Sequence, residues 1–129
     1  MREIKFRAWD KKQKKMIPVT GIDFEFPQVD EYGVLHPMVD VILIQFTGLH
    51  DKNGKEIYEG DIANITLGLI AKGGYTERGV MEFNKESAQF SFLCKDSLFE
   101  EPQERPDAFT IEVIGNIYEN PDLLKGVQE

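Results

Sequence analysis

The stretch DKNGKEIYEGDIANITL, residues 51–67, decides the fold class, because turn signals in it separate short runs of strand-forming residues. Asn53-Gly54 accepts the positive φ angles of a type I′ hairpin turn and predicts such a turn between two strands. Glu59-Gly60-Asp61 then leads into the apolar run 62–67, and Asp61 is expected to accept a hydrogen bond from a nearby backbone amide. The stretch therefore predicts β-structure.

Similar runs lie on the N-terminal side. Residues 3–9 alternate, with Ile4, Phe6 and Ala8 on one face and Lys5, Arg7 and Trp9 on the other, which predicts a half-buried strand. Residues 16–19 return as its partner, at a sheet edge because Pro18 lacks an amide donor. Residues 22–26 predict a strand and residues 27–37 a loop. The run 39–46 is apolar on both faces and predicts a strand between two layers or inside an oligomer.

The C-terminal side continues the pattern. We expect a glycine-rich loop at 68–79, a hairpin from 79–83 and 88–93, and an exposed acidic excursion at 95–108. A last strand at 109–114 precedes one helical turn at 120–126, with Asn120 as its N-cap. The fold class predicted is all-β with a minor helix, and residues 57–118 form a small five-stranded barrel.

Composition excludes several classes of protein. The chain has 129 residues, with 41% hydrophobic and 29% charged side chains, as in a folded globular protein. No apolar run approaches the roughly 18 residues of a membrane-spanning helix, and we expect no secretory signal at the N-terminus. The single Cys94 cannot form an intrachain disulfide, which fits a reducing cytoplasm. One cysteine and two histidines exclude a closed Cys/His zinc site.

Charge is distributed unevenly along the chain. Fifteen basic and 23 acidic residues give a net charge of −8. Residues 1–15 alone hold seven basic and two acidic side chains, a local balance of +5, so the remainder carries −13. Such a polarised molecule attracts an acidic partner at one end and also attracts copies of itself.

The basic N-terminal hairpin is the one candidate binding site. Cations bind phosphate, and an aromatic ring beside them stacks on a base. The patch therefore predicts contact with nucleic acid or with an acidic protein surface. A lysine-rich hairpin tip is most often a solvated turn, or one that protects an edge strand from aggregation, and that reading is favoured over either contact. The candidate residues are Lys5, Arg7, Trp9, Lys11, Lys12, Lys14 and Lys15.

The sequence predicts no group of catalytic side chains. His50-Asp51 opens the Asn-Gly hairpin, where exposed polar side chains are expected, and His36 stands beside Pro37 in the predicted loop. Two histidines without spaced carboxylates do not make a metal motif. We therefore expect no cofactor, no metal and no enzymatic activity, with a hydrolase using His50, Asp51 or Asp61 as an alternative.

Three blocks of the sequence resemble the YopX-like proteins of phages and prophages. They are residues 2–10 with the lysine-rich turn that follows, residues 45–62 and residues 111–121, in the order that the family has. The resemblance implies a β-rich, SH3-like barrel, self-association and a phage or prophage gene product in the bacterial host cytoplasm. It supplies no catalytic residue to transfer.

Together these observations predict two regions, N-terminal β-strands at 1–46 and an SH3-like barrel with a short helical turn at 47–129. The predicted function is a non-enzymatic, self-associating β module that binds another macromolecule, a phage or host protein. Nucleic-acid binding through the basic hairpin is the alternative function, and no membrane association is expected.

Overall fold

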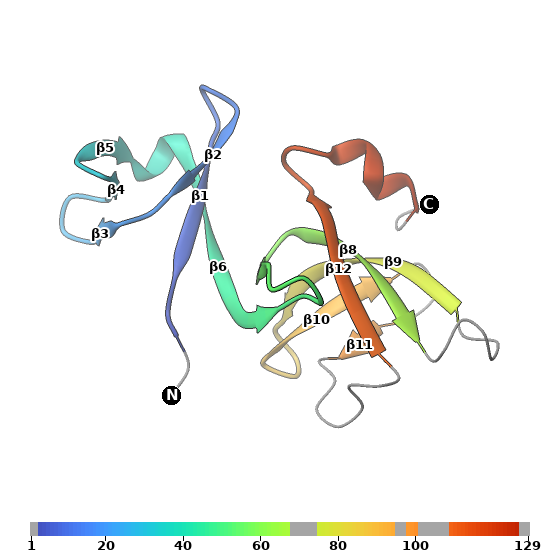
Figure 1. Cartoon of the computed structure of the whole chain (residues 1–129). Helices are drawn as coiled ribbons and strands as arrows, with labels where there is room; N and C mark the ends of the chain where they lie inside the picture. The colour runs from blue at the N-terminus through green and yellow to red at the C-terminus, as the bar shows by residue number, and fades with distance from the viewer. Residues whose placement is uncertain (1–2, 68–74, 95–97, 101–108, 127–129) are drawn as a thin grey trace. The chain divides into compact units, whose positions relative to one another are not determined.

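The computed structural model describes residues 3–67, 75–94, 98–100 and 109–126, which form twelve strands and two short 3-10 helices. The all-β class and the small-barrel architecture are confirmed. Two compact units, Met1–Phe46 and Thr47–Glu129, make up the chain (Figure 1). That these units are separately folding domains stays a prediction. No helix in the described part of the chain has the length and apolar character to cross a membrane.

The first unit contains two small antiparallel sheets. Its elements are β1 (Phe6–Asp10), β2 (Lys15–Pro18), β3 (Gly21–Asp23), β4 (Gln28–Glu31), β5 (Val34–Pro37), the 3-10 helix η1 (Met38–Asp40) and the start of β6 (Val41–His50). Strands β2, β1 and β6 are neighbours in one sheet, and β3, β4 and β5 form the other. Strand β2 lies at the edge, as Pro18 predicted.

Residues of both sheets form the core of this unit. Ala8, Ile17, Val29 and Val41 are buried against one another, so the sheet of β1, β2 and β6 packs on β4. The prediction that 39–46 is one strand, apolar on both faces within layers, was wrong at its start, because Val39 lies in η1 and is exposed. Strand β6 begins at Val41 and runs on into the second unit.

The loop predicted at 27–37 was wrong, because these residues form the β4–β5 hairpin. Glu31 and Val34 are paired across a two-residue turn, and its central residues Tyr32 and Gly33 have φ angles of +47° and +94°. Positive φ at both positions is the type I′ geometry. The side chain of Asp30 supports the turn by accepting the Gly33 amide at 2.6 Å.

The type I′ turn predicted at Asn53-Gly54 was also wrong. Gly54 has a φ of +83°, whereas Asn53 is not among the residues with positive φ. The Gly54 amide donates to the carbonyl of Asp51 at 3.0 Å, while the Asp51 carboxylate accepts the amides of Asn53 and Lys55. These side-chain hydrogen bonds select a different turn from the one that the dipeptide alone favours.

The second unit contains a curled five-stranded antiparallel sheet (Figure 1), and the short strand β7 is the sheet neighbour of β6. The order in the five-stranded sheet is β11-β10-β9-β8-β12. Its elements are β7 (Glu56–Tyr58), β8 (Asp61–Leu67), β9 (Tyr75–Asn84), β10 (Gln89–Cys94), β11 (Leu98–Glu100), β12 (Phe109–Asn116) and the 3-10 helix η3 (Pro121–Gly126). Helix η3 is the helical turn that the sequence predicted.

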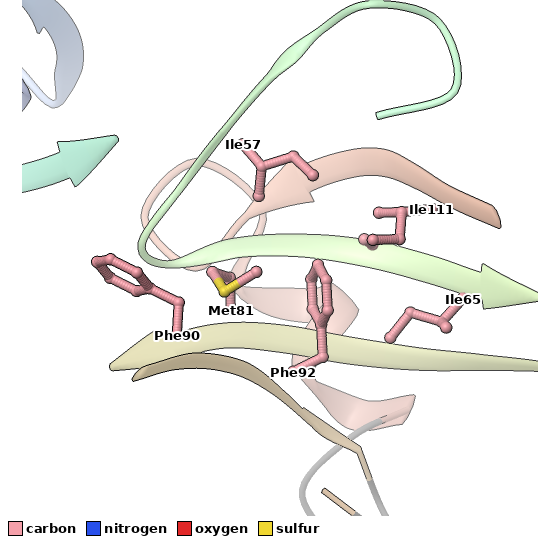
Figure 2. Packing of buried hydrophobic residues seen from close by; sticks show 7 residues of the cluster. Ile57, Ile65, Met81, Phe90, Phe92 and Ile111 are labelled. Atoms are coloured by element: carbon pink, nitrogen blue, oxygen red, sulfur yellow. The ribbon is translucent and has the colours of Figure 1, made fainter. Parts of the chain in front are cut away.

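Buried side chains of this unit pack together in clusters. Figure 2 shows the core cluster, whose side chains come from strands between β7 and β12. Its buried members are Ile57, Ala63, Ile65, Met81, Phe90, Phe92 and Ile111. In another cluster Ile62 and Val80 pack against residues that follow β12, among them Ile117 and Leu123 of the η3 segment. The C-terminal segment therefore completes the packing of the barrel strands.

Other boundaries differ from the predictions. The strand predicted at 22–26 ends at Asp23, because that carboxylate accepts the amides of Glu25 and Phe26 and turns the chain. Part of the predicted 68–79 loop, from Tyr75, belongs to β9, and residues 98–100 of the predicted acidic excursion form β11. The remainder of both segments, 68–74, 95–97 and 101–108, lies outside the described residues.

Candidate binding surface

The basic hairpin is built on Asp10, the last residue of β1. The Asp10 side chain, 3% exposed, accepts the backbone amides of Lys12 at 2.9 Å and Gln13 at 3.1 Å, and its carbonyl accepts the Lys14 amide at 2.8 Å. The charged run 10–15 contains no apolar residue and predicts an exposed turn, which is wrong for Asp10 because its side chain is buried. A carboxylate at this position saturates the amides of the turn and so holds the lysines on a fixed backbone.

Electrostatics keep this carboxylate ionised. The hydrogen bond from the Gln13 amide lowers the pKa of Asp10 most, burial opposes that change, and the Lys12 amide with nearby His36 and Lys15 lowers the pKa further. The net effect is a pKa below the ordinary value of an aspartate. The turn thus carries a permanent negative charge beneath its lysines at neutral pH.

Three candidate residues share one face of the β1 sheet, as predicted. Arg7 and Trp9 alternate with Ala8, and Lys5 continues the same side, where its Nζ lies 5.9 Å from the ring centroid of Phe46. Trp9 and Arg7 are half-buried. This arrangement places two cations and an indole ring on one strip of sheet.

The four turn lysines do not all extend that strip. Lys12 forms an ion pair with Asp40, with Nζ and Oδ2 3.2 Å apart. Lys15 is the strand partner of Asp10, so its side chain lies on the opposite face from Trp9. Lys11 and Lys14 are exposed in the turn itself. The hairpin therefore separates the candidate residues into a strip and a turn.

A side-chain cluster that the sequence analysis did not find lies beneath the turn. His36 is in β5, not in a loop, and its Nε2 is 2.9 Å from Oε1 of Glu31 while its Nδ1 is 3.8 Å from Oδ2 of Asp10. The ring is thus bracketed by two carboxylates. Recognising the β4–β5 hairpin would have predicted this position of His36, because the register of the hairpin pairs His36 with buried Val29.

The carboxylates considered for catalysis have structural partners. Asp61, 1% exposed, accepts the Tyr58 amide at 2.8 Å, as the sequence suggested. Asp51 is buried, contrary to the exposed position predicted, and its Oδ2 accepts the Val113 amide at 3.0 Å. Burial raises the pKa of Asp51, but the amides of Val113, Lys55 and Asn53 together lower it below its ordinary value. His50 is exposed at the end of β6.

Metal ligation has no support in the described residues, where no group of three or more His, Cys, Asp or Glu side chains could hold an ion. Chemically, the first unit presents a rigid cationic turn and a strip with Lys5, Arg7 and Trp9. Both features suit contact with a polyanion or an acidic surface.

The fold and this surface define the class as small all-β proteins with a barrel-like sheet and a charged hairpin. The family model for the YopX protein matches residues 5–125, and the chain belongs to that family. The crystal structure of protein EF1440 from Enterococcus faecalis is similar, with a TM-score of 0.67 and 26% sequence identity over 96% of this chain and 99% of that one. No curated protein matches the chain.

Proposed function

We propose that the protein is a non-enzymatic phage or prophage module that self-associates and binds a phage or host macromolecule in the cytoplasm of the bacterial host. The observation that carries this proposal is the lysine turn held by Asp10. Because its backbone is already fixed by three hydrogen bonds, little backbone conformational entropy is lost when the lysines bind.

Charge supports self-association. Residues 47–129 hold 16 acidic and eight basic side chains, so the second unit carries the whole net charge of −8, whereas residues 1–46 hold seven of each. Within the first unit all seven cations lie in residues 1–15. The basic turn of one molecule is therefore attracted electrostatically to the acidic second unit of another molecule.

The roles of Asp51 and Asp61 support a function without catalysis. A carboxylate that accepts backbone amides is an ionised, fixed acceptor, whereas a general base must be free to take a proton from a substrate. Turnover lost in Asp61→Ala, after broad substrate screening with added divalent metals, would contradict this part of the proposal.

Light scattering through a salt titration tests self-association. We expect a mass above the 14.8 kDa of the monomer at low salt. It should fall toward the monomer as salt rises from about 0.01 M to about 1 M, since the screening length shrinks from roughly 30 Å to roughly 3 Å. A monomer at every salt concentration contradicts the proposal, and a pull-down from the host identifies the second partner.

Nucleic-acid binding is the second candidate, favoured by the shared face of Lys5, Arg7 and Trp9. It predicts gel shifts at micromolar protein with DNA or RNA, and an affinity that falls steeply with salt. Lys5→Gln together with Arg7→Gln should abolish the shift, whereas Lys85→Gln with Lys125→Gln on the second unit should leave it. The absence of a shift at low salt ends this candidate.

A further inference from the structure

A groove lies in the second unit beside the Glu59-Gly60 turn. It has a volume of about 290 Å³, and Glu59, Gly60, Glu82, Phe83, Ile117 and Tyr118 contribute to its lining, with buried residues of β9 beneath. Small-molecule sites occupy roughly 300–1,000 Å³, so this groove is at or below the lower end of that range. Its size fits one long side chain better than a cofactor.

The groove is built by defined hydrogen bonds. The Gly60 amide donates to the carbonyl of Met81 at 2.8 Å, and the Ile117 amide donates to the carbonyl of Gly60 at 2.9 Å. These two bonds fix the turn between β9 and the segment after β12. Gly60 has a φ of +87°, and a Cβ there would lie 3.2 Å from the Tyr118 ring. The concave shape therefore depends on a glycine at this position.

The chemistry of the lining selects a cation. Glu59 and Glu82 supply two carboxylates, and no lysine or arginine lines the groove among the residues that the structure describes. Phe83 and Tyr118 supply aromatic surface, against which the aliphatic stem of a lysine packs while its ammonium group reaches a carboxylate. The unit around the groove carries the net charge of −8, which attracts a cation from a distance.

We infer that this groove receives a lysine of the β1–β2 turn, Lys11 or Lys14, from a second copy of the chain. Both lysines are exposed, and the structure shows no ion pair for either among the described residues. Their backbone is held by Asp10, so the turn is presented as a rigid projection. This inference rests on the proposed self-association and names the two surfaces that meet.

A mixing experiment tests the pairing. Glu59→Gln/Glu82→Gln removes the groove charges, and Lys11→Gln/Lys14→Gln removes the turn charges. Each double variant alone should self-associate about tenfold more weakly in sedimentation velocity at low salt. A mixture still contains one intact turn and one intact groove, so it should form a 1:1 complex more tightly than either variant associates with itself.

Matched controls separate this pairing from general electrostatics. Glu77→Gln/Glu86→Gln and Lys85→Gln/Lys125→Gln change the same number of charges elsewhere on the second unit and should leave the association constant unchanged. Circular dichroism confirms that each variant is folded. A dilution series of amide chemical shifts should move Gly60 and Phe83 together with Lys11 and Lys14, but not Gly33.

The outcomes distinguish the inference from the proposal beneath it. A wild-type protein that is monomeric at low salt overturns self-association itself. A wild-type protein that associates while the groove and turn variants behave like their controls, or while their mixture forms no complex, overturns the groove and leaves the proposed function standing.

Discussion

The two units differ in how many of their large apolar side chains are exposed to solvent. Among the described residues, eight of the nine exposed large hydrophobic residues lie in the first unit, including Phe24, Phe26 and Tyr32, and Phe83 alone lies in the second. A unit of 46 residues encloses little volume, because the buried fraction of the surface falls with chain length. In the part of the chain that the structure describes, the second unit packs seven buried side chains in one cluster, against four in the cluster of the first unit.

The first unit relies correspondingly more on its turns. Asp10, Asp23 and Asp30 each accept a backbone amide two or three residues further on, so side-chain oxygens satisfy the hairpin turns. The second unit uses the same device at Asp51, Asn84 and Asn116, but there it adds to an extensive core. The comparison indicates that core packing dominates the stability of the barrel and that polar turns contribute a larger share in the first unit.

The largest loss of stability is expected from a substitution in the core of the second unit. Phe92→Ala removes a fully buried ring from the core of the second unit and should lower the free energy of unfolding by about 3–5 kcal/mol. Phe24→Ala removes a ring that is 83% exposed and should change it by less than about 0.5 kcal/mol. Urea unfolding followed by circular dichroism measures both.

Trp9 is the single tryptophan and reports on the first unit. If residues 1–46 and 47–129 are separate domains, the fluorescence midpoint of Phe92→Ala should equal that of the wild type. A midpoint lowered together with the circular dichroism signal would show that the two units unfold as one.

The next largest loss of stability is expected when Asp51 is replaced in a turn of the second unit. Asp51→Ala leaves the amides of Asn53, Lys55 and Val113 without their acceptor, and should cost about 3 kcal/mol. The Asp10→Ala change removes two such bonds and should cost less. Equal costs for the two variants would contradict the special role of the bond to Val113, which joins residues 62 positions apart.

Acid stability follows from the same two carboxylates. Because the folded state lowers the pKa of Asp51 and of Asp10, their contribution is complete above the unfolded value of about 3.9 and is lost as the pH falls through the folded pKa. We expect the melting temperature to drop below about pH 4. Asp51→Asn should be less stable at pH 7 and show a shallower acid drop. A drop as steep as in the wild type would rule out Asp51 as its source.

The smallest losses of stability are expected when either of two glycines with positive φ is replaced by alanine. Gly33→Ala in the first unit meets no atom within 4 Å and should cost about 1 kcal/mol from backbone strain alone. Gly60→Ala in the second unit adds the contact with Tyr118 and should cost about 1 kcal/mol more. Chemical denaturation of both variants measures the difference, and equal costs would mean that the Tyr118 ring moves aside freely.

Local patterns predicted most of the strands correctly. The alternation of residues 3–9 and Pro18 predicted the β1–β2 hairpin and its edge position, and Asn120-Pro121 predicted the start of η3. The β4–β5 hairpin was missed because Tyr32 at a positive φ is not a common turn residue, and its stability comes partly from the Asp30 side chain. Pro27, Gly33 and Pro37 are typical loop residues, and their spacing favours a loop over a hairpin in this stretch.

The candidate surface was predicted in part for a similar reason. Strand periodicity placed Lys5, Arg7 and Trp9 on one face, because alternate residues of a strand always share a face. It could not show that Asp40 pairs with Lys12 or that His36 lies between Glu31 and Asp10, since those partners come from other elements of the fold. The groove beside Gly60 joins three segments distant in sequence and has no local signal.

The sequence by itself determined the β class, the positions of most turns and the separation of charge between residues 1–15 and the rest of the chain, because periodicity, turn chemistry and charge are local properties. Only the tertiary structure decided which aspartates are buried, which lysines remain exposed and where a concave acidic surface forms. Those features depend on which strands become neighbours, and neighbours in a sheet are chosen by packing over long distances along the chain.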